Sequence, residues 1–153
     1  MSNTQNIADV KVRGASKKQF RVNGDPNNII ELNTSDIGIV KRLEDSLPQL
    51  EALGKEALDA KAKEATENAE AVPALLATLS DYDKKMKSIV NFIFDSNVAD
   101  KCAAGGTMYD PVDGEFRYMV IVADLMNVYN DDLASEIDKV IKAAEKHTDK
   151  YTK

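Results

Sequence analysis

FIFDSNVADKCAAGGTMYDPVDGEFRY, residues Phe92 to Tyr118, is the stretch that decides the fold of this chain. It joins two long helical patterns through an aromatic patch, a Gly-Gly pair, a proline and the only cysteine. Seven of the nine aromatic residues of the chain lie between Tyr82 and Tyr129. Because a Phe or Tyr buries far more apolar surface than an Ala, we expect the specific part of the core to form here.

Composition limits the classes of protein to which the chain can belong. At 153 residues and 43% apolar content, it is long enough for one domain with a core that needs no cross-links. Its longest apolar run, Met119 to Ala123, is far too short to cross a bilayer, and the first residues show no signal-peptide pattern. A single cysteine excludes an internal disulfide and fits a reducing cytoplasm. The net charge of −6 argues against nucleic acid as the main partner.

The first residues differ in charge from the rest. Between Met1 and Phe20, four Lys or Arg residues oppose one Asp, so this segment carries +3. Residues 1–17 have no hydrophobic periodicity, and we expect them to form a flexible N-terminal arm. The alternative is an arm that becomes ordered on an acidic partner or on a neighbouring copy.

A β-hairpin is predicted directly after this arm. Residues 18–22 and 29–32 are β-prone, and the turn-rich hexapeptide Asn23 to Asn28 separates them. An isolated hairpin is marginally stable in water, so this one should pack on helices or pair with another chain.

Helical patterns follow from residue 37 onward. Residues 33–36 offer several N-cap side chains, and apolar residues then recur every three or four positions up to Leu53. Pro48 is expected to break or kink this helix unless it opens a new first turn. Residues 51–71 are rich in Ala and charge with a thin apolar stripe, so a solvent-exposed helix is predicted there; the alternative is a helix that needs a neighbour to cover the stripe.

In the second half of the chain, a broad apolar stripe predicts a helix over residues 72–93. A short helical piece at 98–103 should end at the Gly-Gly pair, and residues 110–114 read as a turn. The last helix is expected from Glu115, with a possible interruption at residues 130–132. The predicted fold class is therefore α-dominated (α+β): an N-terminal β-hairpin packed on three or four helices. We expect residues 18–147 to form this single domain and residues 148–153 to form a frayed tail.

Residue types that carry chemistry occur without a supporting pattern. The spacing of Asp110, Asp113 and Glu115 does not match a calcium-binding loop, and turn or cap roles explain them better. His147 is the sole histidine and has no ligand framework around it, while Cys102 has no base beside it in the sequence. We therefore expect no enzymatic activity, no cofactor and no metal site.

The aromatic patch is the best candidate for a binding surface. Consecutive helical residues point about 100° apart, so one helix face cannot bury Phe92, Ile93 and Phe94 together. Either the helix is enclosed on most sides, or one aromatic side chain points outward and binds a partner. The candidate partner-binding residues are Phe92, Phe94, Val98, Tyr109 and Phe116.

Two stretches carry a resemblance to a known family. Residues 18–43, KQFRVNGDPNNIIELNTSDIGIVKRL, and residues 89–129, IVNFIFDSNVADKCAAGGTMYDPVDGEFRYMVIVADLMNVY, give a hairpin leading into a helix and a hydrophobic helix joined to a final one. In this order the chain resembles the small tail assembly chaperones of long-tailed bacteriophages of Gram-positive hosts.

The resemblance implies a non-enzymatic protein in the host cytoplasm. Such a protein binds and coats the helical tape measure protein before the tail tube polymerises around it, and it can self-associate. The alternative is a structural virion component, a connector or tail-completion protein that forms a ring of its own copies. Neither role involves a membrane or nucleic acid as partner.

Overall fold

The structure is a computed structural model that describes residues 6–12, 17–64 and 72–151, with the side chains of 63–64 and 145–151 outside the description. Within these residues the chain forms four α-helices, two small antiparallel hairpins and one 3-10 turn. The elements are β1 (Lys18–Arg21), η2 (Val22–Gly24), β2 (Ile29–Leu32), α1 (Ile39–Glu64), α2 (Val72–Phe94), α3 (Ala99–Ala103), β3 (Pro111–Val112), β4 (Glu115–Phe116) and α4 (Arg117–Tyr151). The predicted fold class, a hairpin with a small helical bundle, is confirmed.

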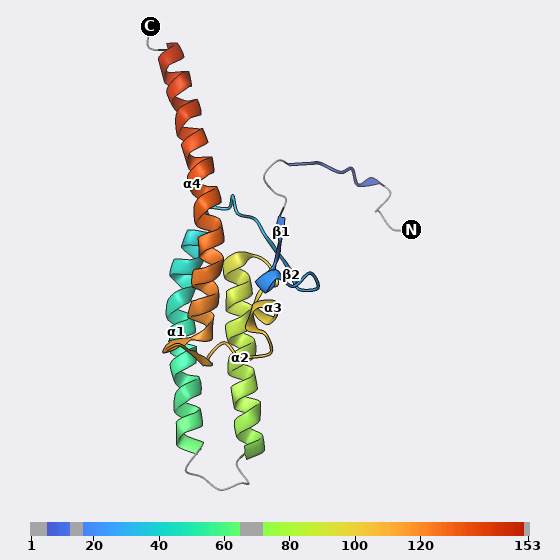
Figure 1. Cartoon of the computed structure of the whole chain (residues 1–153), viewed down its shortest axis with the longest axis vertical. Coiled ribbons are helices and arrows are strands. Elements are labelled where there is room, and N and C mark those ends of the chain that lie inside the picture. The colour runs from blue at the N-terminus through green and yellow to red at the C-terminus, as the bar shows by residue number, and fades with distance from the viewer. Residues whose placement is uncertain (1–5, 13–16, 65–71, 152–153) are drawn as a thin grey trace.

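The helical body is a pair of helices with a third packed along it. α1 and α2 lie side by side, and the first half of α4 packs against them (Figure 1). The core between them is aliphatic and aromatic, and its fully buried members include Leu50, Met86, Val90, Phe94 and Tyr129. Phe94 and Tyr129 join α2 to α4 through ring centroids 5.9 Å apart at a tilt of 46°. The aromatic core therefore forms where the sequence concentrates its aromatics.

The N-terminal hairpin has the predicted extent. β1 and β2 pair antiparallel with Phe20 opposite Ile30, and both side chains pack against the core. The connection passes through Asn23 and Gly24, whose φ angles of 53° and 74° lie in the left-handed region. Gly24 adopts this conformation without the steric cost that a Cβ imposes, which lets the chain reverse between the strands.

Pro48 does not end a helix, contrary to the prediction. It lies inside α1 with its ring exposed to solvent, and the helix continues for 16 residues beyond it to Glu64. A proline inside a helix costs about 3 kcal/mol. Leucines on both sides of it pack into the core, and burying a leucine stabilises by about 1.5–3 kcal/mol. Burial of Leu47 and Leu50 together therefore offsets the proline.

The second half of α1 has a packed face that the sequence pattern underestimates. Ala57 is fully buried, and a Cβ built on Gly54 would lie 3.1 Å from the Phe116 ring. Small residues here allow α1 to approach its neighbours closely. The predicted exposed helix is thus correct as a helix to Glu64 but not as a wholly exposed one, and residues 65–71 lie outside the described part of the chain.

α4 differs from the prediction at two places. It begins at Arg117 because Glu115 and Phe116 pair with Pro111 and Val112 in the β3–β4 hairpin. It passes through residues 130–132 without interruption, since Tyr129 and Leu133 on either side are both buried. It then continues to Tyr151 through a segment without proline or glycine.

The N-terminal arm is described in part. Residues 6–12 are exposed and lie apart from the helices (Figure 1), whereas residues 1–5 and 13–16 of the predicted flexible arm lie outside the description.

Candidate protein-binding site

The aromatic patch of α2 divides into one buried and one exposed side chain. Phe94 is 1% exposed and contacts Tyr129, whereas Phe92 is 59% exposed. The rotation of about 100° per residue carries the two rings to different sides of the helix. One aromatic therefore points outward, and it is Phe92.

Val98, predicted to bind a partner, is a core residue at the start of α3. Its side chain is fully buried, and its backbone amide donates to Asn91 Oδ1 at 2.9 Å. The same oxygen accepts the amide of Ala99 at 2.8 Å, so a side chain from α2 caps α3. In the folded single chain, Val98 and Phe94 lie beneath the surface and cannot contact a partner.

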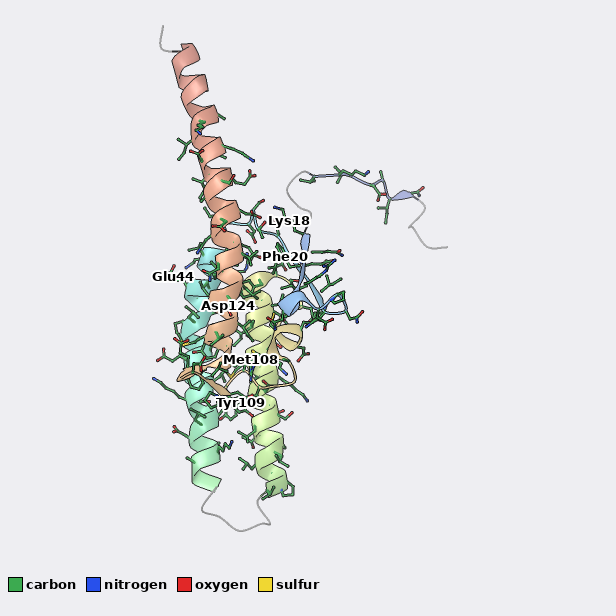
Figure 2. All side chains as sticks on the ribbon, viewed as in Figure 1. Lys18, Phe20, Glu44, Met108, Tyr109 and Asp124 are labelled. Atoms are coloured by element: carbon green, nitrogen blue, oxygen red, sulfur yellow. The ribbon has the colours of Figure 1, made fainter. Side chains whose placement is uncertain are left out.

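Tyr109 and Phe116 come together at an apolar hollow, called here the β3–β4 hollow. Its volume is about 370 Å³, and it is lined by Leu58, Tyr109, Pro111, Gly114, Glu115, Phe116 and Met119. Tyr109 is 8% exposed and donates its hydroxyl to the Leu79 carbonyl at 3.3 Å, so it forms the floor (Figure 2). Phe116 is half-buried and stacks on Tyr118 with centroids 5.5 Å apart.

The rim of the β3–β4 hollow is also apolar. Leu58 from α1 is 42% exposed and Met119 from α4 is 44% exposed. Methionine is unbranched and adapts to irregular partner surfaces. Of the two predicted residues at this site, Phe116 is open to contact from solvent and Tyr109 supports it.

A second apolar surface, called here the α4 stripe, consists of Ile137, Val140 and Ile141. Leu133 is buried, all the described side chains of α4 after it are exposed, and the helix there projects past the body (Figure 1). The three side chains of the stripe are 44%, 66% and 51% exposed. Their spacing predicts one apolar helix face, but only the projection of α4 beyond α1 and α2 leaves that face uncovered.

Charged side chains flank the α4 stripe and pair with one another. Lys139 lies 3.4 Å from Glu136, and Lys142 lies 2.9 Å from Asp138. These are exposed i,i+3 and i,i+4 pairs along the helix, which add only a few tenths of a kcal/mol each. The stripe is therefore an apolar seam between polar borders, the arrangement found in helix–helix contacts.

The polar groups that the sequence offers for chemistry have structural roles. Asp110 accepts the Thr107 amide at 3.0 Å and its hydroxyl at 2.6 Å, and Asp113 occupies the β3–β4 turn with a φ of 51°. Burial raises the pKa of Asp110, but the Thr107 hydrogen bonds and the nearby Arg117 charge outweigh it, so its pKa is lowered.

Cys102 belongs to no metal-ligand set among the described residues. Cys102 is half-buried in α3, and burial raises the pKa of its thiol, which disfavours the reactive thiolate. The side chain of His147 lies outside the description. Among the described residues, no group of three or more His, Cys, Asp or Glu side chains is placed to hold a metal ion.

Comparison of the chain with protein-family models, curated proteins and solved structures finds no match. Among the helices that the structure describes, none combines the length and the apolar character needed to span a bilayer.

Proposed function

We propose that this protein is a non-enzymatic phage tail assembly chaperone, which binds and coats the tape measure protein in the host cytoplasm during tail assembly. The proposal joins the sequence resemblance to one structural observation, the uncovered apolar α4 stripe. Such an apolar stripe on a helix fits a long helical partner.

The spacing along the projecting part of α4 supports a helical partner. Leu133, Ile137, Val140 and Ala144 follow one another at intervals of four, three and four, which is the alternation of a coiled-coil seam. Residues 134–151 span about 27 Å at 1.5 Å per residue, enough for several turns of contact. An isolated helix of this length is marginal in water, so packing against a partner stabilises it.

The β3–β4 hollow offers a second contact on the same chain. It lies at the start of α4, beside the middle of α1 and α2, and so apart from the projecting end of α4 (Figure 1). The two surfaces can therefore engage separated segments of one long partner. Two weak contacts to one chain raise the total affinity through effective concentration. A repetitive helical partner would then hold many copies along its length.

Co-expression tests the proposal. The tape measure protein of the same phage should be recovered in the soluble fraction only with this protein, and the two should elute as a complex. The variant Ile137→Asp with Val140→Asp should lose at least about tenfold in affinity, because two charges would enter an apolar seam.

A matched control carries the same change in charge on the other side of α4. Ser135→Asp with Lys142→Ala lowers the net charge by two and leaves the stripe intact, so binding should stay within about twofold. Circular dichroism on both variants verifies the helix. If the stripe variant binds like the wild type, or if no complex forms with the intact tape measure protein, the proposal fails.

The structural virion component stays the second candidate because the exposed N-terminal arm suits assembly of copies. Mass spectrometry of purified virions separates the two roles. A chaperone is absent from the mature particle, whereas a connector or tail-completion protein is present in stoichiometric amounts.

A further inference from the structure

An open apolar groove, called here the hairpin groove, lies between the β1–β2 hairpin and the first half of α4. Its volume is about 340 Å³. Phe20 and Ile30 line it from the hairpin, and Val120, Ile121, Leu125 and Val128 line it from α4. Figure 2 labels Phe20 and Asp124 on the two elements that bound it. Charged side chains of both signs, Arg21, Arg117 and Asp124, also line the groove.

The N-terminal arm has the complementary character. Ile7, Val10 and Val12 are 71%, 83% and 63% exposed, high values for aliphatic side chains. In an extended chain, alternate residues share a face, so Ala8, Val10 and Val12 form one apolar edge. Asp9 and Lys11 lie on the other edge with Ile7.

We infer that the hairpin groove of one copy binds the extended segment Ile7–Val12 of a second copy, with Ala8, Val10 and Val12 against its apolar floor. The lengths agree. Six extended residues span about 20 Å, and α4 rises about 17 Å between Arg117 and Val128, the limits of the groove along this helix.

The charges also agree. Asp9 of the incoming segment can pair with Arg21 or Arg117, and Lys11 can pair with Asp124. Charges of both signs on the segment thus meet a groove that is lined by charges of both signs.

A second copy is favoured over the chain's own arm by the contacts at the start of β1. Lys17 donates to the Asp95 carbonyl, and Lys18 lies 2.8 Å from Asp132 on α4. The chain's own arm would have to reverse direction between Val12 and Lys17 to enter the groove, while residues 6–12 in fact stand away from the body (Figure 1). An arm from a neighbouring copy needs no reversal.

Each copy carries one arm and one groove. Two copies can exchange arms in a closed pair, or the contact can repeat head to tail. The inference concerns self-association and does not depend on binding of the tape measure protein.

The single cysteine provides a built-in probe, because Cys102 lines the hairpin groove. The rate at which iodoacetamide alkylates Cys102 is measured on the full chain from low to high protein concentration, beside the mass by light scattering. An arm from a second copy should slow alkylation at least about fivefold at high concentration, as the mass rises.

Two variants of the arm test whether the protection of Cys102 comes from the apolar edge of the segment. Val10→Asp with Val12→Asp should abolish both the protection and the rise in mass, and it lies outside the helical body, so folding is unaffected. Ile7→Asp places a charge on the opposite edge of the segment and should retain both effects.

Three results would overturn the inference. If the protection of Cys102 is independent of protein concentration, the arm binds the groove of the same copy. A monomeric mass at all concentrations would exclude self-association, and self-association that survives Val10→Asp with Val12→Asp would assign it to another surface.

Discussion

Lys18 Nζ lies 2.8 Å from Asp132 Oδ2, although 114 residues separate the two in the chain. The same carboxylate accepts a hydrogen bond from the hydroxyl of Thr34, which is buried at the end of the hairpin. Asp132 therefore ties both ends of the N-terminal hairpin to α4.

The tie predicts a dependence of stability on pH. Hydrogen bonds from Lys18 and Thr34 lower the pKa of Asp132 below its ordinary value of 3.8. A carboxyl group whose pKa is lower in the folded chain stabilises the fold above 3.8, and this stabilisation is lost as the pH falls through the lowered pKa. Asp132→Asn should therefore lower the Tm at neutral pH.

The measurement is the Tm of wild type and variant as a function of pH. The two curves should converge in acid, where the wild-type carboxyl is protonated. Asp131→Asn removes the same charge from an exposed neighbour and should leave the Tm nearly unchanged. A difference between wild type and Asp132→Asn that stays constant from neutral to acidic pH would contradict the assignment.

Phe94→Ala should cost about 3–5 kcal/mol of unfolding free energy because it empties the space against Tyr129. Phe92→Ala should cost less than about 1 kcal/mol, since this side chain is largely exposed. Urea unfolding followed by circular dichroism compares the two. Equal losses would mean that both rings are core.

Asn91→Ala should cost about 1–2 kcal/mol, because its Oδ1 accepts the amides of Val98 and Ala99. Asn97 accepts a long hydrogen bond from the Asn91 side-chain amide, at 3.4 Å, and Asn97→Ala serves as the control with a loss below about 0.5 kcal/mol. Hydrogen exchange should show faster opening of α3 in the Asn91 variant alone. Unchanged exchange there would exclude the capping role.

Gly106→Ala should destabilise by about 1–3 kcal/mol. A Cβ at this position would lie 2.7 Å from both Arg117 Nε and Asp110 Oδ2. Asp110 cannot yield freely, because Thr107 holds it through two hydrogen bonds. In an Arg117→Ala background the cost should shrink, which a double-mutant cycle by urea unfolding measures. If the free-energy effects of Gly106→Ala and Arg117→Ala are strictly additive, the cost of the Cβ does not arise from Arg117.

Much of the fold follows from local pattern. The hairpin of residues 18–32 was predictable because a turn-rich hexapeptide separates two β-prone runs. The helix of residues 72–93 was predictable because its apolar residues recur every three or four positions. Pro48 shows where local reasoning fails, because the burial of the neighbouring Leu47 and Leu50 against other elements outweighs its intrinsic preference.

The candidate site was predictable only in its composition. The aromatic patch indicated either an enclosed helix or one ring that faces outward, and the sequence did not decide between the two. Phe94 is buried because Tyr129 of α4 lies beside it, and Phe92 is exposed because no described element covers that side. The exposure of Ile137, Val140 and Ile141 depends likewise on where α1 and α2 end relative to α4.

The sequence by itself determined which elements form, since helix and strand periodicity depend on residues a few positions apart. It also determined that the stretch from Phe92 to Tyr118 contains the aromatic core and a junction between two helices. The tertiary structure alone decided which apolar side chains lie open, because burial depends on contacts between elements that are distant in the chain. The α4 stripe, the β3–β4 hollow and the hairpin groove are all products of that packing.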